Sequence, residues 1–165
     1  MMRVLQPSLR NSLFFLNCLI WIVITSVATL AAEDLQLRPG VSFGQDIDNG
    51  FPLIGKKMDD AVIEPGRAAL IFFGAAGDLN TNRQAKRLVE LYRKELDRKE
   101  QDHGLKFIVV DVDHPVGDDG KKLIKTHYKG YIPCQVLVDK NGRVSWNQIG
   151  EVELSVLKKQ IDKLP

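Results

Sequence analysis

The residue best suited to covalent chemistry is Cys134, in the segment "YIPCQVLVD" at positions 131–139. A lone thiolate can form a mixed disulfide, a covalent dimer or a sulfenic acid, and His127 is the nearby candidate base. Such chemistry needs an exposed sulfur and a lowered pKa, whereas free cysteine commonly packs as a small buried hydrophobe. We favour the buried interpretation. A single-cysteine thiol oxidoreductase, or a peroxide-reactive protein using Cys134, is the enzymatic alternative.

A second candidate site is the turn "GAAGDL", between Gly74 and Leu79, which joins an apolar run to an expected helix. It resembles the dinucleotide-binding turn of glucose-6-phosphate dehydrogenases, where amides at a helix N-terminus can hold phosphate. That enzyme class needs a far longer chain. Asp111 and Asp113 also follow the turn by more than thirty residues, against about 20 in dinucleotide-binding folds. Nucleotide binding is therefore a second, weaker alternative.

The remaining polar residues do not predict a metal site or any other cofactor. Pro115 falls where an EF-hand loop needs a ligand, and the three histidines show no ligand spacing. Asp78 is expected to be a carboxylate at a helix N-terminus, where negative charge is favoured. We expect an ordinary polar loop after a strand for the cluster of Asp111, Asp113, His114, Asp118 and Asp119.

Apolar periodicity predicts the elements that position these residues. Buried strands are expected at 68–73, 105–112 and 132–139, and a tight hairpin at 139–142 leads to a returning strand at 143–148. A capping box formed by Thr81 and Gln84 is expected to begin a helix that runs to about residue 101. Shorter helices are expected at 119–128 and from about 154 to 164. Two parallel crossovers followed by a hairpin predict an α/β protein, with a mixed central sheet and helices on both faces.

This ordered set of segments resembles the thioredoxin superfamily over residues 66–164. "ALIFFG" (69–74) is similar to the strand before the active-site turn, and "FIVVDVD" (107–113) to the central strand after the long helix. "YIPCQVLVDKNGRV" (131–144) is similar to the Ile-Pro loop, strand and hairpin, and "QIG" (148–150) to the ending. The resemblance implies a thioredoxin-like three-layer fold in which Pro133 is the family's cis-proline.

The chain departs from the family where the Cys-x-x-Cys pair belongs. A thiolate at a helix N-terminus is stabilised by the dipole and free amides, but the matching window, 77–81, holds no cysteine. Ala76 or Gly77 replaces the usual tryptophan, and Ile71 stands where many members bury a carboxylate. Two-cysteine exchange is therefore impossible. The resemblance then implies non-catalytic binding of an extended polypeptide or partner protein at Gly77, Asp78, Ile132, Pro133 and Cys134.

The N-terminal residues predict export. Arg3 and Arg10 precede an apolar run at 13–30, and small residues follow, a pattern typical of a signal peptide cleaved after Ala31 or Ala32. The mature protein is then periplasmic or secreted; alternatively, residues 13–30 stay as a membrane anchor. We expect an irregular extension at 33–65, with one short strand and a turn, and a thioredoxin-like domain at 66–165.

Charge argues against nucleic acid as a partner. Residues 1–32 contain two of the 23 basic residues and none of the 21 acidic ones, which leaves 21 of each sign in the mature chain. A chain of zero net charge has no electrostatic attraction to a polyanion as a whole.

Overall fold

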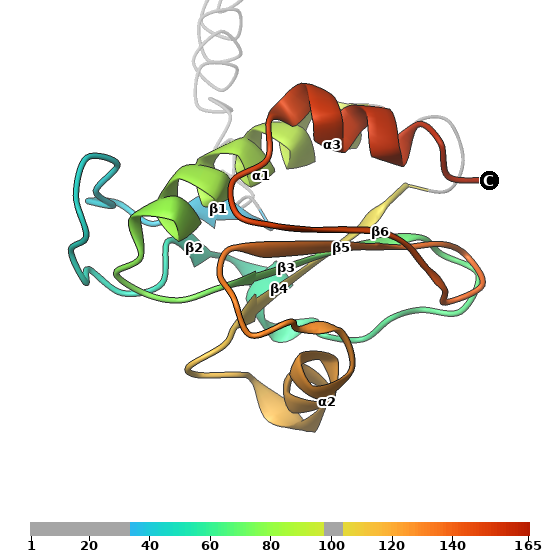
Figure 1. Ribbon diagram of the computed structural model, residues 1–165, viewed down its shortest axis with the longest axis horizontal. Coiled ribbons are helices and arrows are strands. Elements are labelled where there is room, and N and C mark those ends of the chain that lie inside the picture. The colour runs from blue at the N-terminus through green and yellow to red at the C-terminus, as the bar shows by residue number, and fades with distance from the viewer. Residues whose placement is uncertain (1–33, 98–103) are drawn as a thin grey trace, which may run out of the picture. The chain divides into compact units, whose positions relative to one another are not determined.

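The computed structural model describes residues 34–97 and 104–165, except for the side chains of residues 96 and 97 (Figure 1). The described residues belong to one compact unit. The predicted signal peptide and the expected end of the long helix near residue 101 lie outside these ranges. Within them, no helix combines the length and the apolar character needed to cross a membrane.

A four-stranded mixed sheet lies at the centre, in the order β4-β3-β5-β6. Its strands are β3 (Ala69–Gly74), β4 (Lys106–Asp111), β5 (Cys134–Val138) and β6 (Val144–Ile149), all within two residues of the predicted ranges. The hairpin at 139–142 is confirmed: the amide of Gly142 donates to the carbonyl of Asp139, and Gly142 has a φ of 76°.

One prediction about the sheet is wrong. Two parallel crossovers were expected, but β3 is parallel only to β4, and β5 runs antiparallel to β3. The periodicity of a buried strand shows which residues face the core and carries no information about strand direction. The chain therefore forms one parallel crossover, followed by two antiparallel pairings.

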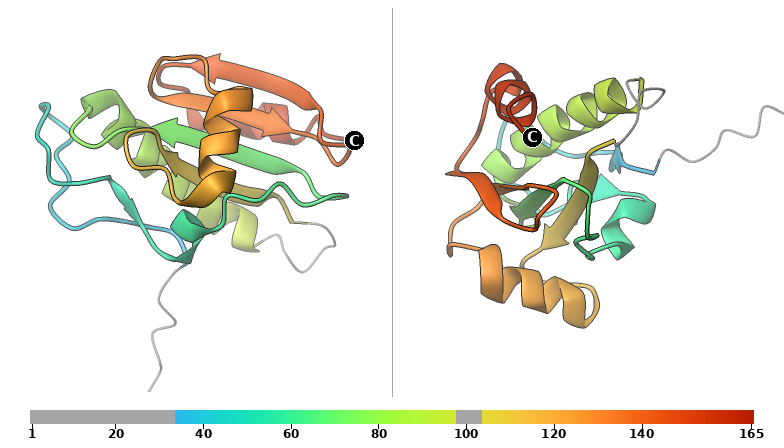
Figure 2. Two further views of the ribbon diagram at one scale, coloured as in Figure 1. Left: turned by 90° about the horizontal axis from the view of Figure 1, so that it is seen from below. Right: turned by 90° about the vertical axis from the view of Figure 1, so that its right-hand side faces the viewer.

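Helices cover both faces of the sheet, as Figures 1 and 2 show. Helices α1 (Leu79–Asp97) and α3 (Leu154–Ile161) lie on one face, and α2 (Gly117–His127) lies on the other. Side chains alternate between the two faces of a strand. On β3, Phe72 therefore packs in the cluster with α1, while Phe73 packs in the cluster with Leu123 of α2. Burial on both faces explains why β3, β4 and β5 appear in the sequence as continuous apolar runs.

The segment before β3 is part of this core. Strands β1 (Gln36–Leu37) and β2 (Leu53–Ile54) form a small antiparallel pair, followed by the short 3-10 helix η1 (Lys56–Asp59). Leu35, Phe51 and Leu53 are buried in the same cluster as α1. The segment thus contains one more short strand than expected, and its apolar side chains stabilise the domain.

Candidate functional site

The turn after β3 and the loop before β5 meet at one edge of the sheet. Phe73 pairs with Cys134 across the two antiparallel strands, so residues 75–78 and residues 132–133 leave the sheet side by side. The peptide bond between Ile132 and Pro133 is cis. Gly77, Asp78 and Ile132 are half-buried, whereas Pro133 and Cys134 are buried. The expected site residues therefore come from two neighbouring segments, but they differ in accessibility.

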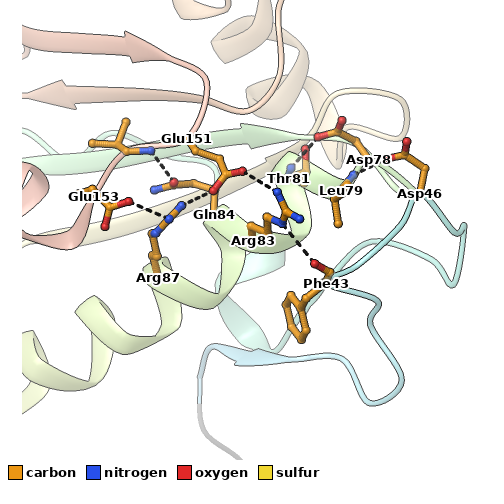
Figure 3. Close-up of polar contacts among 11 residues, drawn as sticks. Phe43, Asp46, Asp78, Leu79, Thr81, Arg83, Gln84, Arg87, Glu151 and Glu153 are labelled. Atoms are coloured by element: carbon orange, nitrogen blue, oxygen red, sulfur yellow. Dashed lines mark hydrogen bonds and ion pairs between the residues drawn. The ribbon is translucent and has the colours of Figure 1, made fainter.

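Helix α1 begins at Leu79, and the predicted capping box is wrong. The carboxylate of Asp78 accepts the backbone N–H of Thr81 (Figure 3), which makes Asp78 the N-cap and confirms it as a helix-terminus carboxylate. The Thr81 hydroxyl instead faces the amide of Ala75, 3.5 Å away. Gln84 Oε1 accepts the N–H of Val152 at 2.8 Å and so holds the connection between β6 and α3.

A loop from the N-terminal segment, residues 42–48, packs against the start of α1 (Figure 3). Asp46 Oδ1 accepts the N–H of Leu79 at 2.8 Å. The side chain of Asn82 donates to the carbonyl of Ser42 at 2.9 Å, and that of Arg83 to the carbonyl of Phe43 at 3.2 Å. These contacts join residues 33 to 40 positions apart, and no local sequence pattern indicates them.

This packing changes the chemistry of the helix N-terminus. Two carboxylates, Asp46 and Asp78, accept the amides of Leu79 and Thr81, which are the groups that hold a thiolate or a phosphate in other proteins. A phosphate would have to displace both carboxylates against their negative charge. The arrangement thus gives no support to the nucleotide-binding alternative.

Cys134 is inaccessible in the described structure. Its side chain is fully buried in the cluster shared with α2. Burial raises the pKa of the Cys134 thiol, although a hydrogen bond from the backbone of Lys129 opposes this effect. Burial and the charge of Lys129 lower the pKa of His127, and no hydrogen bond joins His127 to Cys134 among the described residues. The surroundings of Cys134 favour the neutral thiol, the less nucleophilic form.

Native Cys134 should therefore resist alkylation. In a Cys18→Ser variant, Cys134 is the sole thiol. We expect its rate of reaction with iodoacetamide at pH 8 to be at least about 100-fold lower in the folded protein than in the urea-unfolded chain, because the sulfur must first become exposed. Because the pKa of Cys134 is raised, the alkylation rate should increase only at pH values above the usual pKa of a thiol. Mass spectrometry of timed samples gives the rates. A native thiolate detectable below pH 7 would contradict this prediction.

Asp111, the last residue of β4, caps the loop that follows, whereas Asp118 and Asp119 lie in the first turn of α2. Asp111 Oδ1 accepts the backbone amides of Asp113 and His114 at 3.1 and 3.4 Å. Within residues 34–97 and 104–165, no group of three His, Cys, Asp or Glu side chains is arranged to hold a metal ion. The carboxylate at the end of β4 thus shapes the backbone of the next loop.

The strand order, the single parallel pairing and the two helical layers define a thioredoxin fold, as the sequence predicts. Cys18 and Cys134 are the only cysteines, so this thioredoxin-fold domain contains no Cys-x-x-Cys pair.

Similar solved structures include StoA from Bacillus subtilis, which is 17% identical, with 59% of this chain and 84% of that chain covered and a TM-score of 0.47. Thioredoxin O2 from Arabidopsis thaliana is 20% identical, with 60% and 76% covered and a TM-score of 0.45. A thioredoxin-fold protein from Helicobacter pylori is 23% identical, with 64% and 76% covered and a TM-score of 0.49. No family model matches the sequence, and no curated protein matches it.

Proposed function

We propose that this is an exported thioredoxin-fold protein that binds an extended polypeptide or a partner protein without redox catalysis. The binding surface would be formed by Gly77 and Asp78 on one side and by residues 131–134 on the other. Two observations support this proposal. The register that pairs Phe73 with Cys134 keeps the two segments adjacent, while the only described thiol is buried and has a raised pKa.

Binding would use the exposed part of this surface. Tyr131, in the loop before β5, is 66% exposed, and Ile132 beside it is half-buried. An exposed tyrosine supplies a large apolar area at low entropic cost and a hydroxyl for hydrogen bonding, which suits it to contact varied partners. Pro133 and Cys134 would support the loop from beneath. Backbone pairing along the loop would supply the rest of the affinity, as in strand addition.

Tyr131→Ser should weaken this binding by at least about tenfold, because it removes the largest exposed apolar group of the surface. The probe is a polypeptide kept unfolded by alkylating its cysteines with iodoacetamide, with binding followed by fluorescence anisotropy. Val62→Ser is the matched control: Val62 is 47% exposed and lies in the segment before β3. The proposal would be refuted if the wild-type protein did not bind the polypeptide, or if both variants lost the same amount of affinity.

Export has its own test. If the signal peptide is cleaved, the protein isolated from cells that express the full sequence should begin at Ala32 or Glu33, as measured by intact mass. A mass that includes residues 13–30 would instead support the membrane-anchored alternative.

A further inference from the structure

The two edges of the central sheet differ in how they are covered. The outer edge of β4 lies beside η1 and the segment that follows it. Lys106 of β4 bonds to Asp60 and Glu64, and Arg67 donates to the carbonyl of Gly104 at 2.8 Å. The opposite edge is β6, and no described segment pairs with its outer side. Figure 2 shows β6 as the last strand of the sheet. An open edge of this kind is a template for another strand.

Strand β6 has neither a charged residue nor a proline to protect it against strand pairing, and its one protective feature is a bulge near its start. Its six residues, "VSWNQI", include no charged side chain and no proline. Proteins normally guard open edges with lysine, proline or a bulge. The one irregularity lies near the start of β6, where the pairing of β5 with β6 shifts between Leu137 and Val138. From Trp146 to Ile149 the register is regular, so most of the strand is available for pairing.

The pairing with β5 shows which groups of β6 point outward. The amide of Gly150 donates to the carbonyl of Pro133 at 2.8 Å, so Cys134 and Ile149 form a non-hydrogen-bonded pair. Such pairs alternate with hydrogen-bonded ones along β5, and the amide of Asp139 donates to the carbonyl of Arg143, so Val138 and Val144 also form a non-hydrogen-bonded pair. Ser145 is the extra residue of a bulge, and the backbones of Val144, Asn147 and Ile149 therefore face away from β5. Consistently, the carbonyl of Ile149 accepts a bond from the neighbouring side chain of Gln148. The outer side of β6 thus presents three pairs of backbone groups.

We propose that β6 pairs antiparallel with β6 of a second copy of this chain, about a twofold axis at Asn147. The outward groups then bond to one another, with Val144 of each copy opposite Ile149 of the other and the bulge at Ser145 and Trp146 opposite Gln148. This register brings Arg143 opposite Gly150 and next to Glu151, so opposite charges lie close together at both ends. Glu151 already forms ion pairs with Arg83 and Arg87 within its own chain, and it keeps both of them in the dimer.

A cavity beside β6 also fits a second copy. It has a volume of about 150 Å³ and lies between α2 and the sheet, where Val136, Val144 and Asn147 line it together with Thr126, His127 and Lys129. In the proposed register, Ile149 of the second copy lies opposite Val144 and near Asn147, two of the residues that line this cavity. An isoleucine side chain that is 42% exposed in the single chain would there lie against apolar surface. Self-pairing thus satisfies the backbone, the charges and the apolar surface together.

Sedimentation velocity of the protein isolated from cells that express the full sequence tests this pairing. The interface is small, so we expect a reversible dimer with a dissociation constant in roughly the micromolar range. Ile149→Lys should weaken it at least about tenfold, because a lysine on an edge strand blocks pairing. Val156→Lys is the matched control, since Val156 is 41% exposed but lies on α3. It should leave the dimer unchanged.

A second pair of variants tests the backbone bonds. Asn147→Pro removes an outward amide that β5 does not use, so the sheet should still form, whereas Asn147→Ala keeps the amide. Only the proline variant should abolish the dimer, and its far-ultraviolet circular dichroism should match that of the alanine variant. If proline unfolds the protein, Ile149→Lys alone decides. A protein that stays monomeric, a dimer unaffected by Ile149→Lys, or a monomer that pairs β6 with a foreign peptide would overturn the proposal. None of these outcomes depends on the Tyr131 surface.

Discussion

Replacing Asp60 with Asn and Glu64 with Gln together should lower the free energy of unfolding by about 2 kcal/mol. The side chain of Lys106 is only 2% exposed, and its ammonium bonds to Asp60 at 2.6 Å and Glu64 at 2.7 Å. Removing both negative charges leaves a buried cation without a countercharge, and the loss of a charged partner costs about 3–5 kcal/mol in a fully buried pair. The carboxylates are 38% and 43% exposed, so water would offset part of that cost. Urea unfolding gives the measurement.

The opposite change provides the control. Lys106→Met removes the buried charge, keeps a side chain of similar length, and leaves two carboxylates that solvent can reach. We expect a loss of less than about 1 kcal/mol. Lys106→Met added to the double variant should recover most of its lost stability, because no unpaired charge is then buried. Additive losses would show that the carboxylates act independently of Lys106.

The pH dependence of this cluster has a definite sign. Burial tends to lower the pKa of Lys106, but its hydrogen bonds to Asp60 and Glu64 outweigh burial and raise it. The hydrogen bond from Lys106, helped by Arg67, lowers the pKa of Glu64. The lysine therefore stabilises the fold until pH rises through its folded pKa, and the glutamate until pH falls through its own. The stability difference between the native protein and Lys106→Met should be constant from about pH 5 to pH 10 and change outside that range.

This cluster also explains why the two sheet edges behave differently. The ion pairs hold residues 60–64 beside the first residue of β4, so that edge is closed to other strands. Strand β6 has no such cover in the described structure. If the variants without the carboxylates release residues 60–64, a second edge would open, and association that Ile149→Lys does not prevent should appear.

Sequence patterns were sufficient for the four strands of the central sheet and the three helices that cover it, but they indicated only one of the two short strands before β3. Strands β3, β4 and β5 are buried on both faces, so each appears as an apolar run of matching length. The hairpin was predictable because asparagine and glycine accept positive φ at low cost, and Gly142 has one. These signals are local, and the residues that produce them lie within one or two turns of one another.

The site could not be predicted in the same way because its contacts span long distances in the sequence. Asp46 reaches Leu79 across 33 residues, and Gln84 reaches Val152 across 68. The expected capping bond between Thr81 and Gln84 agrees with the local sequence. In the structure, however, Asp78 caps the helix, and the side chain of Gln84 accepts the buried backbone amide of Val152 instead. Tertiary contacts therefore replaced the expected capping bond at the start of α1, and the periodicity of the sequence carries no information about such contacts.

Gly74→Ala should lower the free energy of unfolding by about 2 kcal/mol, because its new methyl group has no room. A Cβ atom at Gly74 would lie 2.5 Å from Cγ2 of Thr81 and 3.2 Å from the ring of Phe72. Thr81 is fully buried in the first turn of α1 and cannot move without shifting the helix. Gly44→Ala is the control: its Cβ would meet nothing within 4 Å, so stability should be unchanged.

Thr81→Ser should rescue Gly74→Ala, since serine lacks Cγ2 but keeps the hydroxyl that faces the amide of Ala75. Alone, Thr81→Ser should cost about 1 kcal/mol for the lost methyl group. Combined with Gly74→Ala, it should produce a protein more stable than Gly74→Ala alone, with a coupling energy of about 1 kcal/mol or more. Simple additivity in urea unfolding would show that the close approach of β3 and α1 does not fix the turn at 75–78. If the turn forms part of the binding surface, Gly74→Ala should also weaken polypeptide binding, and Thr81→Ser should restore it.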